Sequence, residues 1–135
     1  MKHIALAAAL FVATTTPAAA QQAVELTREL LNETWAVIDV KGKAPEGDVT
    51  TISFAEELAQ GSTSCAVAWT ARYKINLPAV EIWDVQAPAY DCPSAARTTE
   101  FLLLLEDVRS ARTSSEGLEL IGSDGKRLML LTAGG

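Results

Sequence analysis

The sequence predicts a mainly β domain: an antiparallel meander, strongly curled or closed, with one helix packed against it. Three observations favour this fold. Short segments rich in β-branched and aromatic residues recur along the chain, and turn residues separate them. One longer segment instead repeats its apolar residues at helical spacing. A chain of 135 residues also has room for only one domain of ordinary size.

The first twenty residues have the features of a secretory signal peptide. Lys2 and His3 give a positive start, residues 4–13 form an apolar run, and alanines at 18–20 supply the small residues of a cleavage site. The apolar run is too short for a membrane span, which needs about 20 residues. We therefore expect residues 1–20 to be removed after Ala20. The product would be periplasmic or secreted, without a membrane span.

Charge and histidine content exclude several functional classes. The chain has 11 basic and 17 acidic residues and a net charge of −6, and an acidic surface repels nucleic acid. Its single histidine, His3, lies in the expected signal peptide. A mature chain without histidine cannot build a Ser-His-Asp triad, a Cys-His pair or a His-ligated zinc or haem site. We expect no catalytic residues, no cofactor and no metal site.

The domain itself is expected to cover residues 34–132. Residues 21–33 before it are expected to form an N-terminal tail or a short helix, with Val24, Leu30 and Leu31 loosely on one face. The Asp124-Gly125 pair predicts a hairpin turn near the C-terminus. Residues 60–62 read as a break between strands. The strands are expected at residues 34–40, 50–54, 63–75, 80–85, 118–121 and 127–131.

One segment departs from the β pattern. After Pro93, apolar side chains at Phe101, Leu104, Leu105 and Val108 recur at helical spacing. Pro93 near the start is compatible with a first helical turn. The sequence therefore predicts a helix over about residues 94–110, packed deep against the sheet.

Cys65 and Cys92 are the two cysteines of the chain. In an exported protein two cysteines usually pair. The segment they would close is about 27 residues long, which contributes roughly 3.5 kcal/mol on the loop-entropy model. Two buried thiols and a redox pair are the alternatives, and the Cys-x-x-Cys spacing of a typical redox pair is absent.

Two other groups of residues are candidates for a site. Trp83 and Tyr90 are candidates for a binding patch, although aromatic residues on strands also serve as core. Carboxylates are numerous, but strand alternation places Glu81 and Asp84 on opposite faces. A hydrolase needs two carboxylates on one cleft, so solvated surface explains these residues better.

An ordered set of short motifs runs through the chain. It comprises Trp35, Gly42-Lys43, Ile52-Ser53-Phe54, residues 62–65, Asp91-Cys92, residues 100–108, Leu118-Glu119-Leu120 and Asp124-Gly125. This set resembles the META domain, the family of HslJ-like secreted and periplasmic proteins, over about residues 34–131. The chain departs from the family pattern at Ala66, where the family usually has asparagine, and at residues 87–90.

The resemblance implies a small lipocalin-like β-barrel with one helix, and it implies no established reaction. Members of the family are associated with heat shock, envelope stress, and secretion or virulence. We therefore expect a non-enzymatic exported domain, monomeric, that binds an envelope protein or a small ligand whose identity the sequence does not give. The alternatives are a small-ligand carrier with a barrel cavity and, with less support, a carboxylate-based hydrolase.

Overall fold

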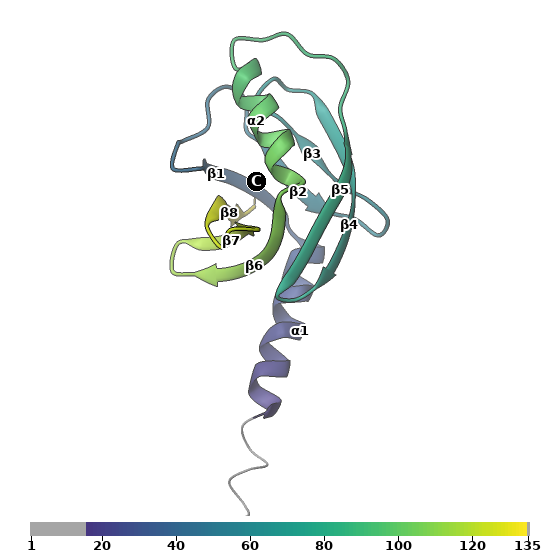
Figure 1. The fold of residues 1–135 in the computed structure, drawn as a ribbon. Coiled ribbons are helices and arrows are strands. Elements are labelled where there is room, and N and C mark those ends of the chain that lie inside the picture. The colour runs from purple at the N-terminus through teal and green to yellow at the C-terminus, as the bar shows by residue number, and fades with distance from the viewer. Residues whose placement is uncertain (1–15, 135) are drawn as a thin grey trace, which may run out of the picture.

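The computed structural model describes residues 16–134, and the side chains of residues 21, 22 and 24–134. Across that range the strands close into an antiparallel barrel in sequence order, with the last strand beside the first (Figure 1). The mainly β barrel expected from the sequence is therefore confirmed. The strands are β1 (Thr34–Val40), β2 (Thr51–Phe54), β3 (Ala59–Ser62), β4 (Ala68–Asn76), β5 (Ala79–Gln86), β6 (Val108–Ser114), β7 (Gly117–Gly122) and β8 (Arg127–Ala133).

Side chains fill the inside of the barrel. Buried apolar residues alternate with more exposed ones along β2 and the first half of β4, whereas β7 and β8 are buried almost throughout. The largest fully buried side chains of these strands are Ile52, Trp69, Leu118, Leu120, Met129 and Leu131. The barrel is therefore a packed core of the kind that stabilises a small domain.

Helix α2 (Ala95–Leu105) packs on the barrel through Phe101, whose ring meets that of Trp69 edge to face with centroids 5.8 Å apart. The helix is shorter than the expected residues 94–110. Val108 lies at the start of β6, where it pairs with Gly122 of β7. Its apolar side chain fits helical spacing and strand alternation equally well. Pairing with β7 places it in a strand and not in the helix.

Helix α1 (Thr16–Asn32) precedes the barrel and includes most of the expected tail or short helix. Leu30 is fully buried and Leu26 packs against the core, whereas Val24 and Leu31 are exposed. The expected face of Val24, Leu30 and Leu31 is therefore wrong, because the barrel contacts the Leu26 side of the helix. Residues 1–15 of the expected signal peptide lie outside the described residues, and the cleavage site remains a prediction.

Residues 60–62, expected to interrupt the β pattern, instead belong to β3. Gly61 is the reason for the misreading. A Cβ added at Gly61 would lie 1.9 Å from the carbonyl oxygen of Thr51, so β2 and β3 approach each other too closely here for any side chain. The indole nitrogen of Trp69 donates to the same carbonyl, at 3.3 Å. The glycine therefore allows β2 and β3 to pack closely at this point.

The expected strand over residues 63–75 begins only at Ala68. Residues 63–67 form a turn, in which the Thr63 amide donates to the Val67 carbonyl and the Ala66 amide to the Thr63 carbonyl. Ala66 has a φ of +62°, in the left-handed region. Cys65 therefore lies on a loop at the end of the barrel. The hairpin at Asp124-Gly125 is confirmed, with Gly125 at φ +82°.

Candidate binding cleft beside strand β5

The barrel is weakly closed between β5 and β6. These two strands share one paired position, Ala79 with Ser110, and one further bond from the Ala111 amide to the Pro78 carbonyl. By contrast, β5 pairs with β4 from Ala79 to Gln86. Beyond Ala79 no further residue of β5 is paired with β6, and the C-terminal part of α2 lies beside β5 (Figure 1). The junction between α2 and β6, and not a paired strand, therefore covers this part of β5.

A surface cleft of about 480 Å³ lies along this edge, lined by Glu81, Ile82, Trp83, Glu106 and Arg109. The Trp83 side chain is its main apolar feature. Trp83 is 43% exposed, whereas Trp35 and Trp69 are 5% and 1% exposed. An indole left in solvent beside a strand edge is typical of a surface that another molecule covers.

In this cleft, side chains make hydrogen bonds to backbone amide and carbonyl groups. The Val85 amide donates to Glu106 Oε2 at 3.2 Å. Arg109 Nη1 donates to the carbonyl oxygens of Glu106 and Val108, both at 2.9 Å. Glu106 and Arg109 are exposed, so these contacts can exchange with solvent or with a ligand.

Strict alternation fails near the end of β5. Asp84 has a φ of +55°, and the pairing with β4 shifts register between Thr70 and Arg72. This bulge leaves Asp84 exposed, like Glu81, although alternation predicts opposite faces for the two carboxylates. Asp84 is paired with Arg72 at 3.6 Å on the surface.

Tyr90 lies in a different setting from Trp83. Its hydroxyl is 2.5 Å from the Thr99 hydroxyl, which ties the loop before α2 to the helix. Tyr90 is also less exposed than Trp83. Of the two residues in the expected patch, Trp83 lines the cleft and Tyr90 positions the loop.

Cys65 and Cys92 are joined by a disulfide with Cα atoms 5.6 Å apart. It connects the turn at residues 63–67 to the loop that leads into α2. Beneath it, the Ser94 hydroxyl donates to the Ser64 carbonyl at 3.1 Å, and the Ser64 and Thr98 hydroxyls lie 2.7 Å apart in a buried contact. Together, the disulfide and these hydrogen bonds hold the start of α2 against the end of the barrel.

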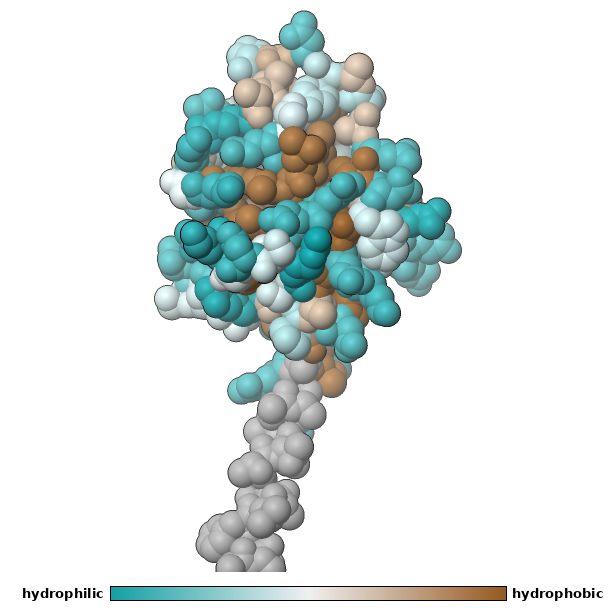
Figure 2. All heavy atoms as spheres, viewed as in Figure 1, coloured by the Kyte–Doolittle hydropathy of each residue, from teal (hydrophilic) through white to brown (hydrophobic). Residues whose placement is uncertain are grey.

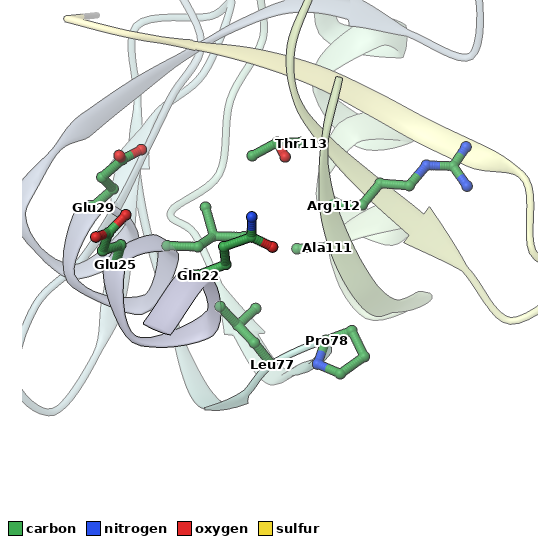
Figure 3. A pocket seen from close by; sticks show the side chains of 9 residues that line it. Gln22, Glu25, Glu29, Leu77, Pro78, Ala111, Arg112 and Thr113 are labelled. Carbon is green, nitrogen blue, oxygen red and sulfur yellow. The ribbon is translucent and has the colours of Figure 1, made fainter. Parts of the chain in front are cut away.

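A second cleft of about 540 Å³ opens where α1 meets the barrel (Figure 3). Glu25 and Glu29 project from the same side of α1, and Leu77 and Pro78 line the opposite side. The Arg112 side chain is directed away from the opening. It pairs instead with Glu119, so the cleft presents two carboxylates without that cation.

A further cluster of charges covers the outer face of β7. Glu119 accepts from Arg112 Nε at 2.6 Å and from Arg127 Nη1 at 3.2 Å, and Arg127 also reaches Asp39 at 3.5 Å. The hydrogen bond from Arg112 lowers the pKa of Glu119, and Arg127 adds to this effect against the opposing effect of burial. A glycosidase acid needs a raised pKa, so Glu119 is unsuited to that role.

A model of the META domain matches residues 28–135 of this chain. The chain belongs to the META domain family. The match includes every strand of the barrel and α2. Among curated proteins, none matches the chain. An NMR structure of a protein from Burkholderia xenovorans is similar to it, with a TM-score of 0.61 and 14% identity over 82% of this chain and 87% of that one. At that identity the likeness shows the fold alone.

Two cleft residues of this META domain were not expected from its sequence. Glu106 and Arg109 fall inside the expected helix at 94–110, which would have placed them on a helical surface. The structure ends α2 at Leu105 and starts β6 at Val108, so both residues lie at the junction that faces β5. Val108 and Ala111 are buried on either side of exposed Arg109 because the pairing with β7 shifts register between Val108 and Ser110, and no local sequence motif predicts that shift.

Proposed function

We propose that this META domain is an exported binding protein without catalytic activity, and that the cleft around Trp83 is its binding surface. The observation that supports this most is an exposed indole beside an incompletely paired strand edge. The indole offers exposed apolar area beside charged side chains, which suits recognition of another molecule. A role under envelope stress agrees with the resemblance to stress-associated relatives.

Two features support export. The first twenty residues have the order of a signal peptide, and the disulfide suits an oxidising compartment. Within residues 16–134, neither helix is long and apolar enough to span a membrane. Mass spectrometry of the intact exported protein tests this part: a chain beginning at Gln21 agrees with it, and retention of Met1 contradicts it.

The two alternatives have less support. A small-ligand carrier needs an open barrel, and fully buried side chains such as Trp69 and Met129 occupy the interior. A carboxylate hydrolase needs one carboxyl group with a raised pKa, and Glu119, whose pKa is lowered, does not fit that role.

A pair of matched variants tests the binding proposal. Trp83→Ala removes the exposed indole in the cleft, and Leu103→Ala removes an apolar side chain that is 71% exposed on α2, outside the residues lining the cleft. We expect the tagged exported protein to recover the same envelope partner with Leu103→Ala as with the unchanged chain, and to lose it with Trp83→Ala. Equal recovery by both variants would contradict the proposal. Circular dichroism and thermal melting confirm that each variant is folded.

A further inference from the structure

We infer that a groove between α1 and the turn that follows β4, called the α1 groove below, binds a single-chain amphiphile with a carboxylate headgroup, such as a free fatty acid. The alkyl chain lies along the apolar side chains of this groove, and the carboxylate pairs with Arg28. The α1 groove is a different surface from the cleft that contains Trp83. The inference therefore goes beyond the proposed function and does not depend on it.

Apolar side chains from two elements line the α1 groove, which has a volume of about 570 Å³. Val24 and Leu31 come from α1, and Ile75 and Leu77 come from the end of β4 and the turn after it. Val24 is 57% exposed and Leu31 is 44% exposed, so the helix presents both side chains to solvent. Figure 2 shows hydrophobic residues at the lower end of the barrel, next to where α1 leaves it in Figure 1. This apolar area favours a hydrocarbon ligand.

The spacing of residues along α1 separates the α1 groove from the acidic cleft on the same helix. Val24, Arg28 and Leu31 follow one another at intervals of four and three residues, so they share one face of the helix. Glu25 and Glu29 are four residues apart on another face, and they line the cleft of Figure 3. Among the described residues that line the α1 groove, Arg28 is the one with a charge. The two faces of α1 therefore differ in sign, and the α1 groove suits an anion.

Arg28 is also the one arginine without a partner among the residues that the structure describes. Ion pairs or hydrogen bonds hold every other arginine of the chain: Arg72, Arg97, Arg109, Arg112 and Arg127. An exposed guanidinium can take a carboxylate in a bidentate pair. The net charge of the chain is −6, so an anion is attracted only close to Arg28, and contact with the apolar side chains supplies most of the affinity.

The size and chemistry of the α1 groove favour an alkyl chain over a peptide. Val24 and Leu31 are seven residues apart, which is about 10 Å along the axis of α1. A peptide in the groove would place its backbone amides against apolar side chains, where they lose hydrogen bonds to water. A hydrocarbon chain has no polar groups to desolvate.

A second copy of this chain fits the α1 groove less well. Arg28 lies between Val24 and Leu31 on the exposed face of α1. Two copies packed antiparallel through this face would bring their Arg28 side chains together, and like charges repel. The charge of Arg28 therefore favours a carboxylate ligand over self-association.

A series of saturated fatty acids tests the inference with the purified, disulfide-bonded protein. Octanoate, decanoate and dodecanoate are added below the concentrations at which they form micelles. We expect each acid to shift the NMR amide signals of residues 24–31 and 75–77. Each pair of added methylenes should tighten binding by about fourfold, which corresponds to half burial of the chain in an open groove. Equal affinity for the three acids, or shifts confined to other parts of the chain, would overturn the inference.

The headgroup is tested with ligands of one chain length. Decanol has no charge, and decylammonium has the opposite charge to decanoate. We expect decanoate to bind about threefold more tightly than decanol, and decylammonium to bind least. Decylammonium that binds as tightly as decanoate would overturn the carboxylate. Binding to vesicles of phosphatidylglycerol, with none to free decanoate, would identify a membrane surface as the occupant and overturn the free acid.

Matched variants locate the ligand. Arg28→Gln should weaken decanoate binding by about threefold and remove its advantage over decanol. Val24→Ser combined with Leu31→Ser should weaken binding of decanoate and decanol alike by about tenfold. Two controls at exposed positions outside the α1 groove, Lys126→Gln and Val49→Ser, should leave binding unchanged. Circular dichroism confirms that each variant is folded. Equal losses in the controls and in the groove variants would overturn the site.

Discussion

Arg112 and Glu119 lie directly opposite each other on β6 and β7, and Arg112 Nε contacts Glu119 Oε1 at 2.6 Å. Arg127 of β8 approaches the other carboxylate oxygen at 3.2 Å. Only 8% of Glu119 is exposed, so the carboxylate is held between two guanidinium groups at the barrel surface. Three consecutive strands are thereby connected by one anion.

This arrangement predicts a pH-dependent stability. The Arg112 hydrogen bond, with the help of Arg127, lowers the pKa of Glu119 in the folded chain below its ordinary value of 4.5. The stabilisation is therefore fully present above pH 4.5 and is lost as the pH falls through the folded pKa. We expect Glu119→Gln to lower the free energy of unfolding by about 1–2 kcal/mol at neutral pH.

Urea denaturation of the two proteins at a series of pH values measures this difference. It should be constant from pH 7 to about pH 5 and then shrink as the solution becomes more acidic. A difference that stayed the same down to low pH would show that the ionised carboxylate is not the source of the stabilisation. Glu57→Gln, on an exposed loop, serves as the control.

The disulfide should account for much of the stability of the barrel. It closes a segment with a sequence separation of 27 residues. Replacing Cys65 and Cys92 together by serine should lower the free energy of unfolding by about 3.5 kcal/mol, mainly by loosening the unfolded chain. Denaturant unfolding measures the loss. Thiol labelling of the unreduced, denatured protein should detect no free thiol, and two labelled cysteines would contradict the pairing.

Replacing Ala66 by asparagine, the residue that the family usually has there, should stabilise the folded chain. The φ of +62° at Ala66 lies in the left-handed region, which is unfavourable for alanine and better tolerated by asparagine. We expect Ala66→Asn to raise the free energy of unfolding by about 0.5–1 kcal/mol. Ala87→Asn, at an exposed loop position without a positive φ, is the matched control and should have little effect. An Ala66→Asn chain no more stable than the control chain would argue against strain at this turn.

Phe101 should make the largest contribution to the packing of α2 against the barrel. It is 3% exposed and contacts Trp69 edge to face. Phe101→Ala should lower the free energy of unfolding by about 3–5 kcal/mol because it leaves a cavity between helix and barrel. Leu103→Ala, on the exposed side of the same helix, should change it by less than about 0.5 kcal/mol. Similar losses for both variants, measured by thermal unfolding, would mean that α2 does not pack as described.

Local pattern was enough to predict most strands and the barrel class. The strand at 34–40 and the hairpin at Asp124-Gly125 follow from β-branched residues and from turn chemistry, both of which act over a few residues. The strand at Gly61 was missed because the reason for its glycine is contact with Thr51 of another strand. The residues next to Gly61 in the sequence give no indication of such a contact.

The site was harder to predict than the fold. Trp83 could be singled out as an aromatic residue on a strand, and the structure exposes it. Glu106 and Arg109 could not, because their position depends on where α2 ends. That end is set by the pairing of Val108 with Gly122, two segments that meet only in the folded barrel. Helical spacing extends past the true end, so the expected helix included both cleft residues.

The central claim is that this META domain acts by binding through the cleft beside β5, and site-specific photocrosslinking in the native envelope tests it most directly. A photoreactive amino acid replaces Trp83 in one strain and Leu103, the exposed residue of α2, in another. We predict one discrete crosslinked partner from position 83 and none from position 103. Crosslinks from position 103 with none from position 83, in folded and exported protein, would contradict the account.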